Sequence, residues 1–383
     1  MADPLFDQVS ATTLADLRDD VVYDEFFVDT AWQRKMRVSG ALDEFLGGTI
    51  MQTPFQYNRV NGGAIAPGSD IAVQQVQILA ATAFVPKLYV EQIPLNLFET
   101  NVIQGSGPAV KVKLVDAYMT NAVQALNTDL AIDFYRHGQS ITSQVTSNRL
   151  IYINGLSEAI NDGINPSWDG GVFTTYGGQL RNGVIGNVLN AVPIWCGTQT
   201  GATGQITYKV IVESYLNCVQ RPDTGLCNKA LYAYLLERQE PKQRFELQQD
   251  ISIGMSGIKV LDGTIFEDKL APSTKYGQLL PAGLSQTTSI QPTTFTSPTY
   301  SGSQNTISLF PSNVTINPGE PFFWLRVKGW KIRPSADAEY NFNFTPPIRS
   351  QTNPDLIVMF LKAAINIYCT APRDNSQVLG AGF

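Results

Sequence analysis

The stretch Lys113–His137, KLVDAYMTNAVQALNTDLAIDFYRH, decides the fold. Its apolar side chains recur every three or four residues, the spacing of one face of an α-helix. They are Val115, Met119, Val123, Leu126, Leu130 and Phe134. His137 and Gly138 mark the predicted end, because histidine complements the negative end of the helix dipole and glycine tolerates the left-handed conformation just past a helix. The sequence therefore predicts one long amphipathic helix near the middle of the chain.

A charged arm precedes this helix, from Asp16 to Asp43. The spacing of its apolar residues predicts at least one helix over Thr13–Arg37. Three basic residues close that helix, namely Arg34, Lys35 and Arg37. They have two interpretations, a solvated helix face or a flank that faces an anionic partner such as nucleic acid.

Between the arm and the long helix lies an extended excursion from Gly47 to about Leu97. Thr49–Val60 reads as a strand, residues 61–70 are rich in turn-forming types, and Ile71–Tyr89 reads as the returning strands. Because an isolated two-stranded hairpin is marginally stable in water, we expect this one to lie on another copy of the chain. The apolar residues predicted to contact that copy are Phe55, Tyr57, Ile71, Val73, Ile78 and Phe84.

The rest of the chain reads as an α/β body. The expected elements are a helix over Ile206–Val219, a buried strand over Lys229–Leu236, short strands over Asp250–Leu270, and strong strands over Phe322–Ile332 and Asp355–Cys369. Residues 276–319 contain no Lys, Arg, Asp or Glu, yet they keep periodic apolar positions. A pure linker would lack these positions, so we expect a small β insertion or a pair of long surface strands, with disorder as the alternative.

Composition favours an assembling protein. A chain of 383 residues exceeds the usual size of one core, so we expect two lobes plus extensions. The charged fraction of 16% is low, which suits a surface that is buried against partners. A net charge of −6 argues against a dedicated nucleic-acid binder but allows the wall of a container around nucleic acid. We expect no secretory signal and no membrane span.

Residues that could carry chemistry are scarce. His137 is the only histidine and is expected to be structural, so we predict no catalytic, metal or cofactor site. Asp129 and Asp133 share a helical spacing, but we expect them on a solvated face or in ion pairs with a neighbour. The four cysteines show no metal-ligand spacing and are expected to be buried, reduced thiols.

A second basic cluster falls in the predicted strand Phe322–Ile332 and just beyond it. It comprises Arg326, Lys328, Lys331 and Arg333. We favour a strip of ion pairs at an interface over a patch that faces DNA, because the chain as a whole is mildly acidic.

The pattern resembles the major capsid proteins of tailed bacteriophages, which have the Hong-Kong-97-type fold. The helix around Val115–Phe134 looks like the spine helix of that family, and the excursion Gly47–Leu97 looks like its extended loop. Ile153–Gly163 with Phe173–Gly177 is similar to the start of its axial domain, and Leu356–Arg373 to the closing strand of its peripheral domain. The uncharged run Tyr276–Gly319 departs from a minimal member.

This resemblance implies an α+β fold with six parts. They are an N-terminal arm (1–46), an extended loop or β-hairpin (47–97), a peripheral domain with the spine helix (98–161), an axial domain (162–281), an uncharged β-rich insertion (282–320) and return strands of the peripheral domain (321–383). It also implies a shell of hexamers and pentamers of this chain around double-stranded DNA, without a cofactor. The shell would be assembled in the host bacterial cytoplasm and would become the virion capsid. Scaffolding, portal and decoration proteins are further partners that it suggests.

Two alternatives stay open. An encapsulin-like nanocompartment subunit shares the fold but would hold an enzyme cargo, and genes encoded nearby would separate the two. A soluble α/β enzyme with an unrecognised site would instead form a discrete small oligomer.

Overall fold

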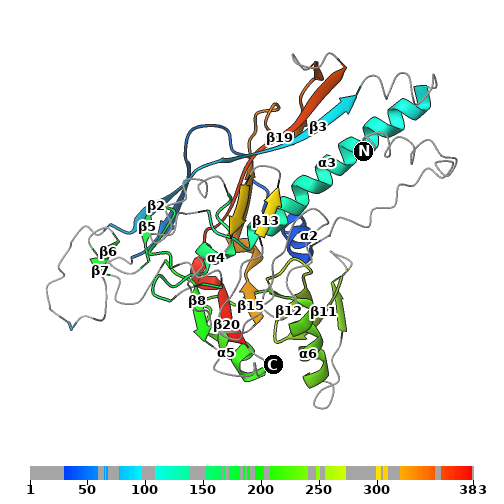
Figure 1. Ribbon diagram of the computed structural model, residues 1–383. Coiled ribbons are helices and arrows are strands. Elements are labelled where there is room, and N and C mark those ends of the chain that lie inside the picture. Colours follow the sequence, from blue (N-terminus) through cyan, green and yellow to red (C-terminus); the bar gives the residue numbers. More distant parts are fainter. Residues whose placement is uncertain are drawn as a thin grey trace.

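The computed structural model describes residues 30–58, 64, 66–67, 77–96, 108–138, 152–165, 167–168, 172–181, 184–185, 188–189, 195–201, 208–239, 247–250, 255–272, 299–302, 305–308, 320–349 and 355–381. Figure 1 shows a long helix beside a long strand pair, with a smaller α/β lobe below them.

The helices are α2 (Ala31–Val38), α3 (Pro108–Phe134), α4 (Leu156–Ala159), α5 (Tyr208–Leu216) and α6 (Lys229–Gln239), with 3-10 turns η4 (Val327–Gly329) and η5 (Pro372–Asp374). The strands of the first half are β1 (Met51–Gln56), β2 (Leu79–Phe84), β3 (Lys87–Asn96), β4 (Thr175–Tyr176), β5 (Gln179–Leu180), β6 (Val184–Ile185), β7 (Val188–Leu189) and β8 (Thr198–Gly201). Those of the second half are β9 (Thr224–Cys227), β10 (Leu247–Asp250), β11 (Met255–Val260), β12 (Gly263–Glu267), β13 (Thr299–Gly302), β14 (Asn305–Ser308), β15 (Glu320–Leu325), β16 (Trp330–Pro334), β17 (Asn343–Phe344), β18 (Ile348–Arg349), β19 (Leu356–Cys369) and β20 (Ser376–Ala381).

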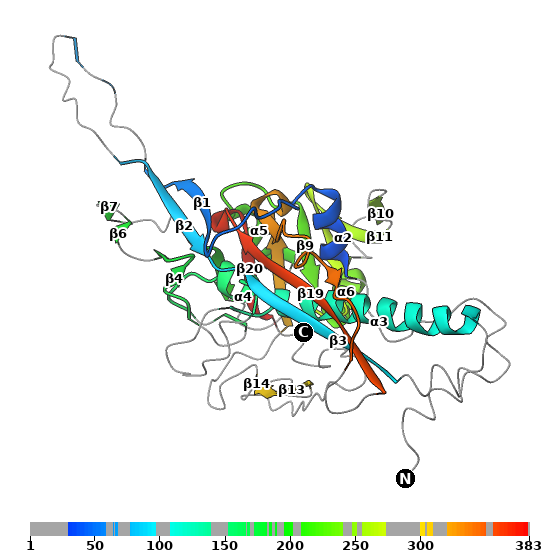
Figure 2. The same ribbon diagram turned by 90° about the horizontal axis from the view of Figure 1, so that it is seen from above.

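The upper sheet is built around β19, which pairs with β16, β17, β18 and β3. Its longest pairing is antiparallel with β3, where Leu356 faces Asn96 and Ile365 faces Lys87. The N-terminal arm adds to this sheet, because Leu42 and Phe45 form parallel bridges with Ile332 and Ser335 beside β16. Helix α3 runs along the strand pair in both views (Figures 1 and 2).

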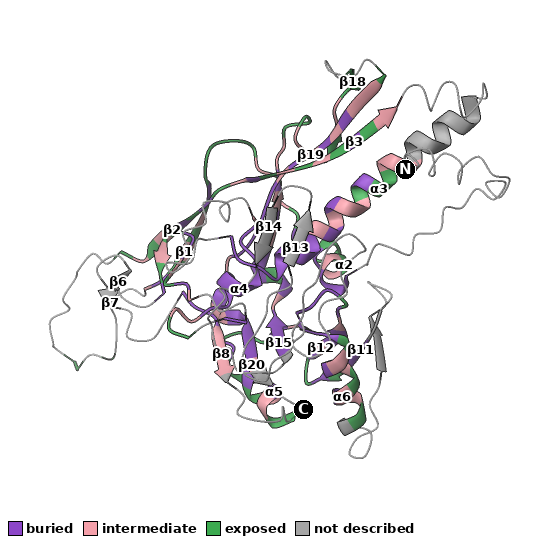
Figure 3. Cartoon of the chain, in the orientation of Figure 1, coloured by how far each residue is buried: buried purple, intermediate pink, exposed green. Residues whose placement is uncertain are grey.

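The lower lobe contains a seven-stranded sheet in the order β10-β11-β12-β9-β15-β20-β8. Side chains of a strand alternate between faces, so β15 serves two cores. Phe322 and Trp324 pack with the buried residues of α5 and α6, whereas Phe323 and Leu325 belong to the core around the end of α3. Both faces of the central strands are therefore buried, as the colouring of Figure 3 shows.

The predicted long helix is confirmed, with shifted ends. It begins at Pro108 rather than near Lys113, and proline is favourable in the first turn because its missing N–H would be unpaired there anyway. Leu126, Leu130 and Phe134 form its buried stripe, but Val123 is exposed. The helix ends at Phe134. Gly138 does not have a positive φ, and it is needed instead because an added Cβ would lie 2.6 Å from the carbonyl oxygen of Tyr152.

The strand prediction for Lys229–Leu236 is wrong, because this segment is helix α6. Asn228 starts the helix by accepting a hydrogen bond from the Leu231 backbone N–H at 2.8 Å. Leu231 and Leu235, four residues apart, are the side chains that the helix buries. A short apolar run alone does not distinguish a buried strand from a buried helix. The feature that indicates a helix here is the N-cap residue Asn228.

The prediction of one strand over Phe322–Ile332 is also wrong. Strand β15 ends at Leu325, η4 intervenes, and β16 starts at Trp330 in the other sheet. The assignment of all of 321–383 to one lobe fails for the same reason, since β15 and β20 are central strands of the lower sheet. The other proposed domain boundaries remain predictions.

Other elements agree with the sequence. Helix α5 lies within Ile206–Val219, strands β11 and β12 within Asp250–Leu270, and β19 within Asp355–Cys369. In the uncharged run, β13 and β14 form a small antiparallel pair. Helix α2 supports the predicted arm helix, whose earlier part lies outside the described residues. Within the described part of the chain, no helix is both long enough and apolar enough to cross a bilayer.

Candidate assembly elements

The base of the hairpin, strands β1 and β2, lies at one side of the body (Figure 2), and of residues 59–76 only 64, 66 and 67 are described. Strands β1 and β2 pair antiparallel, from Met51 opposite Phe84 to Gln56 opposite Leu79. The returning chain then continues into β3, which pairs with β19 in the upper sheet. The predicted excursion to Leu97 is thus a two-stranded hairpin followed by a strand of the body.

Aromatic rings hold the base of the hairpin. Phe84 stacks on Tyr368 with ring centroids 4.2 Å apart. On the other strand, Phe55 stacks on Trp195 at 4.2 Å. Tyr176 meets Phe84 edge-on at 5.1 Å. Such pairs each contribute about 0.5–1.5 kcal/mol beyond their buried area, so the base is firmly attached to its own subunit.

This packing corrects the role predicted for several hairpin residues. Phe84 is 2% exposed and Tyr57 is 4% exposed, so both are used in the core of their own chain and offer almost no surface to a neighbour. Phe55 and Ile78 are half-buried. Ile71 and Val73 lie outside the described residues. Contact of the hairpin with another copy stays a prediction.

Exposed apolar side chains near the hairpin lie at positions other than the predicted contact residues. They include Leu79, Val85, Leu88 and Val90, each about half exposed. In β3 the even-numbered positions from 88 to 94 are exposed, and the odd-numbered positions from 87 to 93 are buried or half-buried. Of these, Tyr89 and Glu91 are hydrogen-bonded to aspartates of α3. Side chains of a strand alternate between its two faces, so the sequence shows which residues share a face. It does not show which of the two faces is buried, because that depends on the elements that pack against the sheet.

The arm places its three basic residues on one short helix. Arg34 and Arg37 are exposed on α2, and an Arg37 guanidinium nitrogen donates to Asn127 Oδ1 on α3 at 3.2 Å. Lys35 lies over the Phe266 ring, with its ammonium nitrogen 5.2 Å from the centroid. The two arginines fit a solvated helix face, whereas Lys35 partly serves packing between the arm and the lower lobe.

The second basic cluster is not a uniform strip. Arg326 pairs with Asp374 at 2.6 Å, and Arg333 pairs with Asp43 of the arm. Lys331 is half-buried and Lys328 is exposed on η4. The two arginines thus have acidic partners within their own chain. Contact of this cluster with another subunit stays a prediction.

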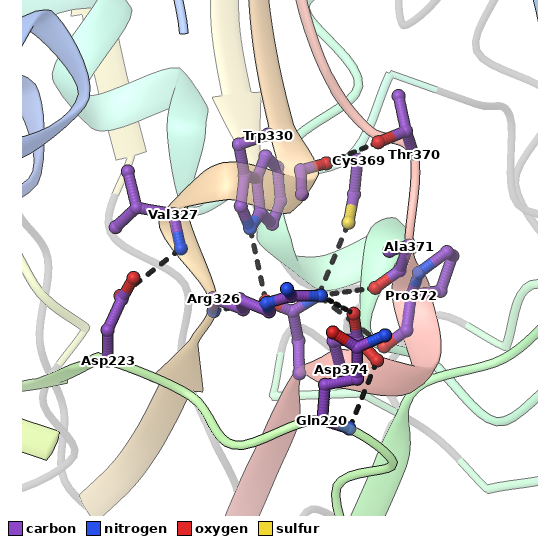
Figure 4. Close-up of polar contacts among 12 residues, drawn as sticks. Gln220, Asp223, Arg326, Val327, Trp330, Cys369, Thr370, Ala371, Pro372 and Asp374 are labelled. Atoms are coloured by element: carbon purple, nitrogen blue, oxygen red, sulfur yellow. Dashed lines mark hydrogen bonds and ion pairs between the residues drawn. The ribbon is translucent and has the colours of Figure 1, made fainter. Parts of the chain in front are cut away.

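Figure 4 shows where the chain crosses between the two sheets. One crossing follows β15 through η4 into β16, and the other leaves β19 through η5 into β20. We call these two segments, residues 326–329 and 370–375, the crossover junction. Asp374 accepts from Arg326 on one crossing and from the Gln220 backbone N–H at 3.2 Å, and Asp223 accepts from the Val327 N–H at 3.2 Å.

Asn375 is the centre of this junction. Its Oδ1 accepts hydrogen bonds from the Arg326 backbone N–H at 2.9 Å and from Trp330 Nε1 at 3.2 Å. Its Nδ2 donates to the Ala371 carbonyl at 2.9 Å and lies 3.2 Å from Cys369 Sγ. One buried amide thus bonds to both crossings. Burial raises the pKa of Cys369 to about 12, so its thiol stays protonated.

A second buried polar group surrounds helix α4. Glu158 of α4 accepts from the Gly138 backbone N–H at 2.7 Å and from Asn154 Nδ2. Arg181, also fully buried, donates to the carbonyls of Glu158 and Asn161, the latter at 2.6 Å, and so caps the end of α4. Burial lowers the pKa of Arg181 to about 10, which leaves it charged at neutral pH.

A groove of about 220 Å³ lies between β3 and α3. Asp133 lines it, but is buried, where it pairs with Arg136 at 2.9 Å and accepts from the Tyr89 hydroxyl at 2.8 Å. The prediction of a solvated Asp133 is wrong, because the strand covers this side of the helix. Burial raises the pKa of Glu91, whose carboxyl is hydrogen-bonded to Asp129.

Groups with catalytic potential are used structurally. His137 is buried, with its ring centroid 5.1 Å from that of Phe173. All four cysteines are buried and free, as predicted. Among the described residues no group of three or more His, Cys, Asp or Glu side chains could hold a metal ion.

The buried carboxyl of Asp268 should make the free energy of unfolding depend on pH. It accepts from the Tyr135 hydroxyl at 2.6 Å, and burial raises its pKa to about 6. The folded chain therefore binds this proton more tightly than the unfolded chain, and this contribution to stability falls as pH rises from about 4 to about 6. Relative to Asp268→Asn, the free energy of unfolding of the natural chain should fall by about 2 kcal/mol between pH 4 and pH 7.

Urea unfolding at several pH values measures this difference. Asp337→Asn is the control, because Asp337 is exposed, and its curve should run parallel to that of the natural chain. Parallel curves for Asp268→Asn would contradict the prediction.

Comparison with known proteins identifies this fold. No protein-family profile matches the sequence, and no curated protein matches it. Solved structures do match. The capsid asymmetric unit of cyanophage A-1(L) superposes with a TM-score of 0.60 at 11% identity, covering 94% of this chain and 95% of that one. The chain has the Hong-Kong-97-type phage capsid fold.

Two further structures share the fold. The capsid of a native GTA particle matches with a TM-score of 0.52 at 7% identity, covering 97% of this chain and 99% of that one. The holo-SrpI encapsulin complex from Synechococcus elongatus matches with a TM-score of 0.52 at 9% identity, covering 97% and 94%. The α+β prediction is confirmed, and both shell-forming alternatives use this fold.

Proposed function

We propose that the chain is the major capsid protein of a tailed bacteriophage. It assembles with copies of itself into hexamers and pentamers, forms an icosahedral shell around double-stranded DNA in the bacterial cytoplasm, and has no enzymatic activity. The observation that carries the proposal is the similarity to the cyanophage capsid subunit, which extends over 94% of this chain. Scaffolding, portal and decoration proteins are the further partners that such a shell needs.

The surface of the subunit supports this role. The hairpin leaves the body with half-exposed Leu79 and Val85, and Leu88 and Val90 continue the apolar surface along β3. Exposed apolar surface of this kind marks a site of protein contact. Each copy would cover such side chains on its neighbours, and many modest contacts would add up to a strong shell.

The encapsulin-like alternative is kept because of the match to the holo-SrpI complex. The contents of the particles separate the two. Particles from the native source would be treated with nuclease, opened, and tested for nucleic acid and for protein cargo. Protected double-stranded DNA is expected. Particles that hold a folded enzyme and no DNA would overturn the phage assignment in favour of a nanocompartment.

A further inference from the structure

The turn between β4 and β5, residues 175–180, lies along the second edge of the hairpin. Strand β1 occupies one edge of β2. On the opposite edge, the Ala83 N–H donates to the Gly177 carbonyl at 2.9 Å, and Gln179 Nε2 donates to the Ala81 carbonyl at 2.7 Å. The turn therefore satisfies backbone groups that would otherwise be open to a new strand.

The same turn is attached to the body. The Tyr176 hydroxyl accepts a hydrogen bond from the Cys369 backbone N–H at 2.7 Å, at the end of β19. The Tyr176 carbonyl accepts from Trp195 Nε1 at 2.8 Å, and Trp195 stacks on Phe55 of β1. The turn thus connects both strands of the hairpin to the end of β19.

Gly177 brings the turn into close contact with β2. Its φ of +57° is in the left-handed region, and an added Cβ would lie 2.8 Å from the Phe84 ring and 2.9 Å from Thr82 Cβ. Gly178 also has a left-handed φ, +77°, but an added Cβ would meet nothing within 4 Å. Only the first glycine is required by the contact with the hairpin.

Two short segments that could act as pivots flank the hairpin. Gly47 and Gly48 precede β1 with φ of +127° and +111°, and Val85 and Pro86 separate β2 from β3. Strand β3 itself is held by ten paired residues on β19. The base of the hairpin can therefore change its angle only if its contacts with the turn and the aromatic rings break.

We propose that the turn 175–180 is a latch that sets the angle of the hairpin within the isolated subunit, before any neighbour is present. The hairpin is then presented to the next copy in a preset direction, and opening of the latch permits a different angle in the shell. The consequence for assembly rests on the proposed capsid function, but the latch itself does not.

Hydrogen–deuterium exchange on unassembled subunits or capsomers tests the latch. In Gly177→Ala, the Ala83 amide should exchange about tenfold faster, because its hydrogen bond to the turn is broken. Gly178→Ala is the matched control, because it also places alanine at a left-handed φ but its Cβ collides with nothing. It should leave the exchange rate of the Ala83 amide unchanged. Amides in β3, and those of β19 before Cys369, should keep their protection in both variants.

Gln179→Glu is a second variant that avoids backbone strain. A carboxylate cannot donate to the Ala81 carbonyl, so faster exchange in β2 is expected here too. Equal exchange in Gly177→Ala and Gly178→Ala, or unchanged exchange in Gln179→Glu, would overturn the latch. Since none of these measurements needs a shell, the latch can fail while the capsid function stands, and the reverse.

Discussion

Replacing Asn375 by alanine is expected to destabilise the subunit by about 3–5 kcal/mol, because each buried polar group left without a partner costs about 1–3 kcal/mol. The substitution removes the acceptor for the Arg326 N–H and Trp330 Nε1, and the donor for the Ala371 carbonyl. Arg326 and Ala371 lie in the two crossings of the junction, and Trp330 is the first residue of β16, so both sheets lose their common support. Chemical denaturation followed by tryptophan fluorescence measures the loss.

The control for Asn375 is an exposed asparagine. Asn165→Ala removes a side chain that is hydrogen-bonded to Asp162 on the surface, and it should change the free energy of unfolding by about 0.5 kcal/mol or less. A loss below about 1 kcal/mol for Asn375→Ala would show that water or relaxation replaces the amide, and that the junction does not depend on it.

Gly155→Ala is expected to cost about 3 kcal/mol, the upper end of the typical range for overpacking, because the groups that the new methyl would meet cannot move aside. Gly155 starts α4 with an ordinary φ of −79°, so the backbone angle is not the obstacle. An added Cβ would collide with the carbonyl of Phe134, and would lie 2.5 Å from that of Arg136 and 2.8 Å from that of Asp133. All three are backbone oxygens at the end of α3 or just past it, and they cannot turn aside as a flexible side chain would.

Gly329→Ala is the matched control for that collision. Its added Cβ would lie 3.4 Å from Ala371 Cβ, which needs only a small adjustment, and its φ is also not left-handed. We expect a thermal midpoint close to that of the natural chain for Gly329→Ala, and a large drop or insoluble protein for Gly155→Ala. Similar midpoints for the two variants would mean that the contact between α3 and α4 tolerates separation.

Long periodic elements could be predicted from the sequence, because their pattern depends only on residues close together in the chain. Helix α3 shows its period over many residues, and Leu126, Leu130 and Phe134 are indeed its buried side chains. Strand β19 is an apolar run bounded by turn residues, and it became the centre of the upper sheet. The small β insertion was predicted from apolar positions alone, and β13 with β14 confirms it within the described residues.

The errors concern partners rather than local patterns. The segment at 326–329 reads as continuous strand because nothing in its composition shows that the chain changes sheets there. Asp133 was predicted to be solvated, but β3 covers this side of α3 and Tyr89 donates a hydrogen bond to it. Phe84 was predicted to contact another copy, but its ring stacks on Tyr368 of the same chain. The role of Asn375 has no signal in a single sequence, since its partners are distributed over the chain.

The sequence therefore predicted that a hairpin and two basic clusters exist, but not which of their side chains are exposed or paired. The hairpin exists, but the apolar side chains exposed at its base are Leu79 and Val85 rather than Tyr57 and Phe84. The basic arginines at 326 and 333 exist, but their acidic partners lie in the same chain. Period-two patterns show which residues share a face, and only the fold shows which face is buried.

Electron microscopy of the purified chain tests the central claim most directly. After size-exclusion chromatography, the protein would be examined by negative stain over a range of protein and salt concentrations, alone and with the scaffold from its own source. The capsid account predicts closed shells, tubes or ring-shaped capsomers with five- and six-fold symmetry. A uniform small oligomer that never assembles further, with or without that scaffold, would contradict it.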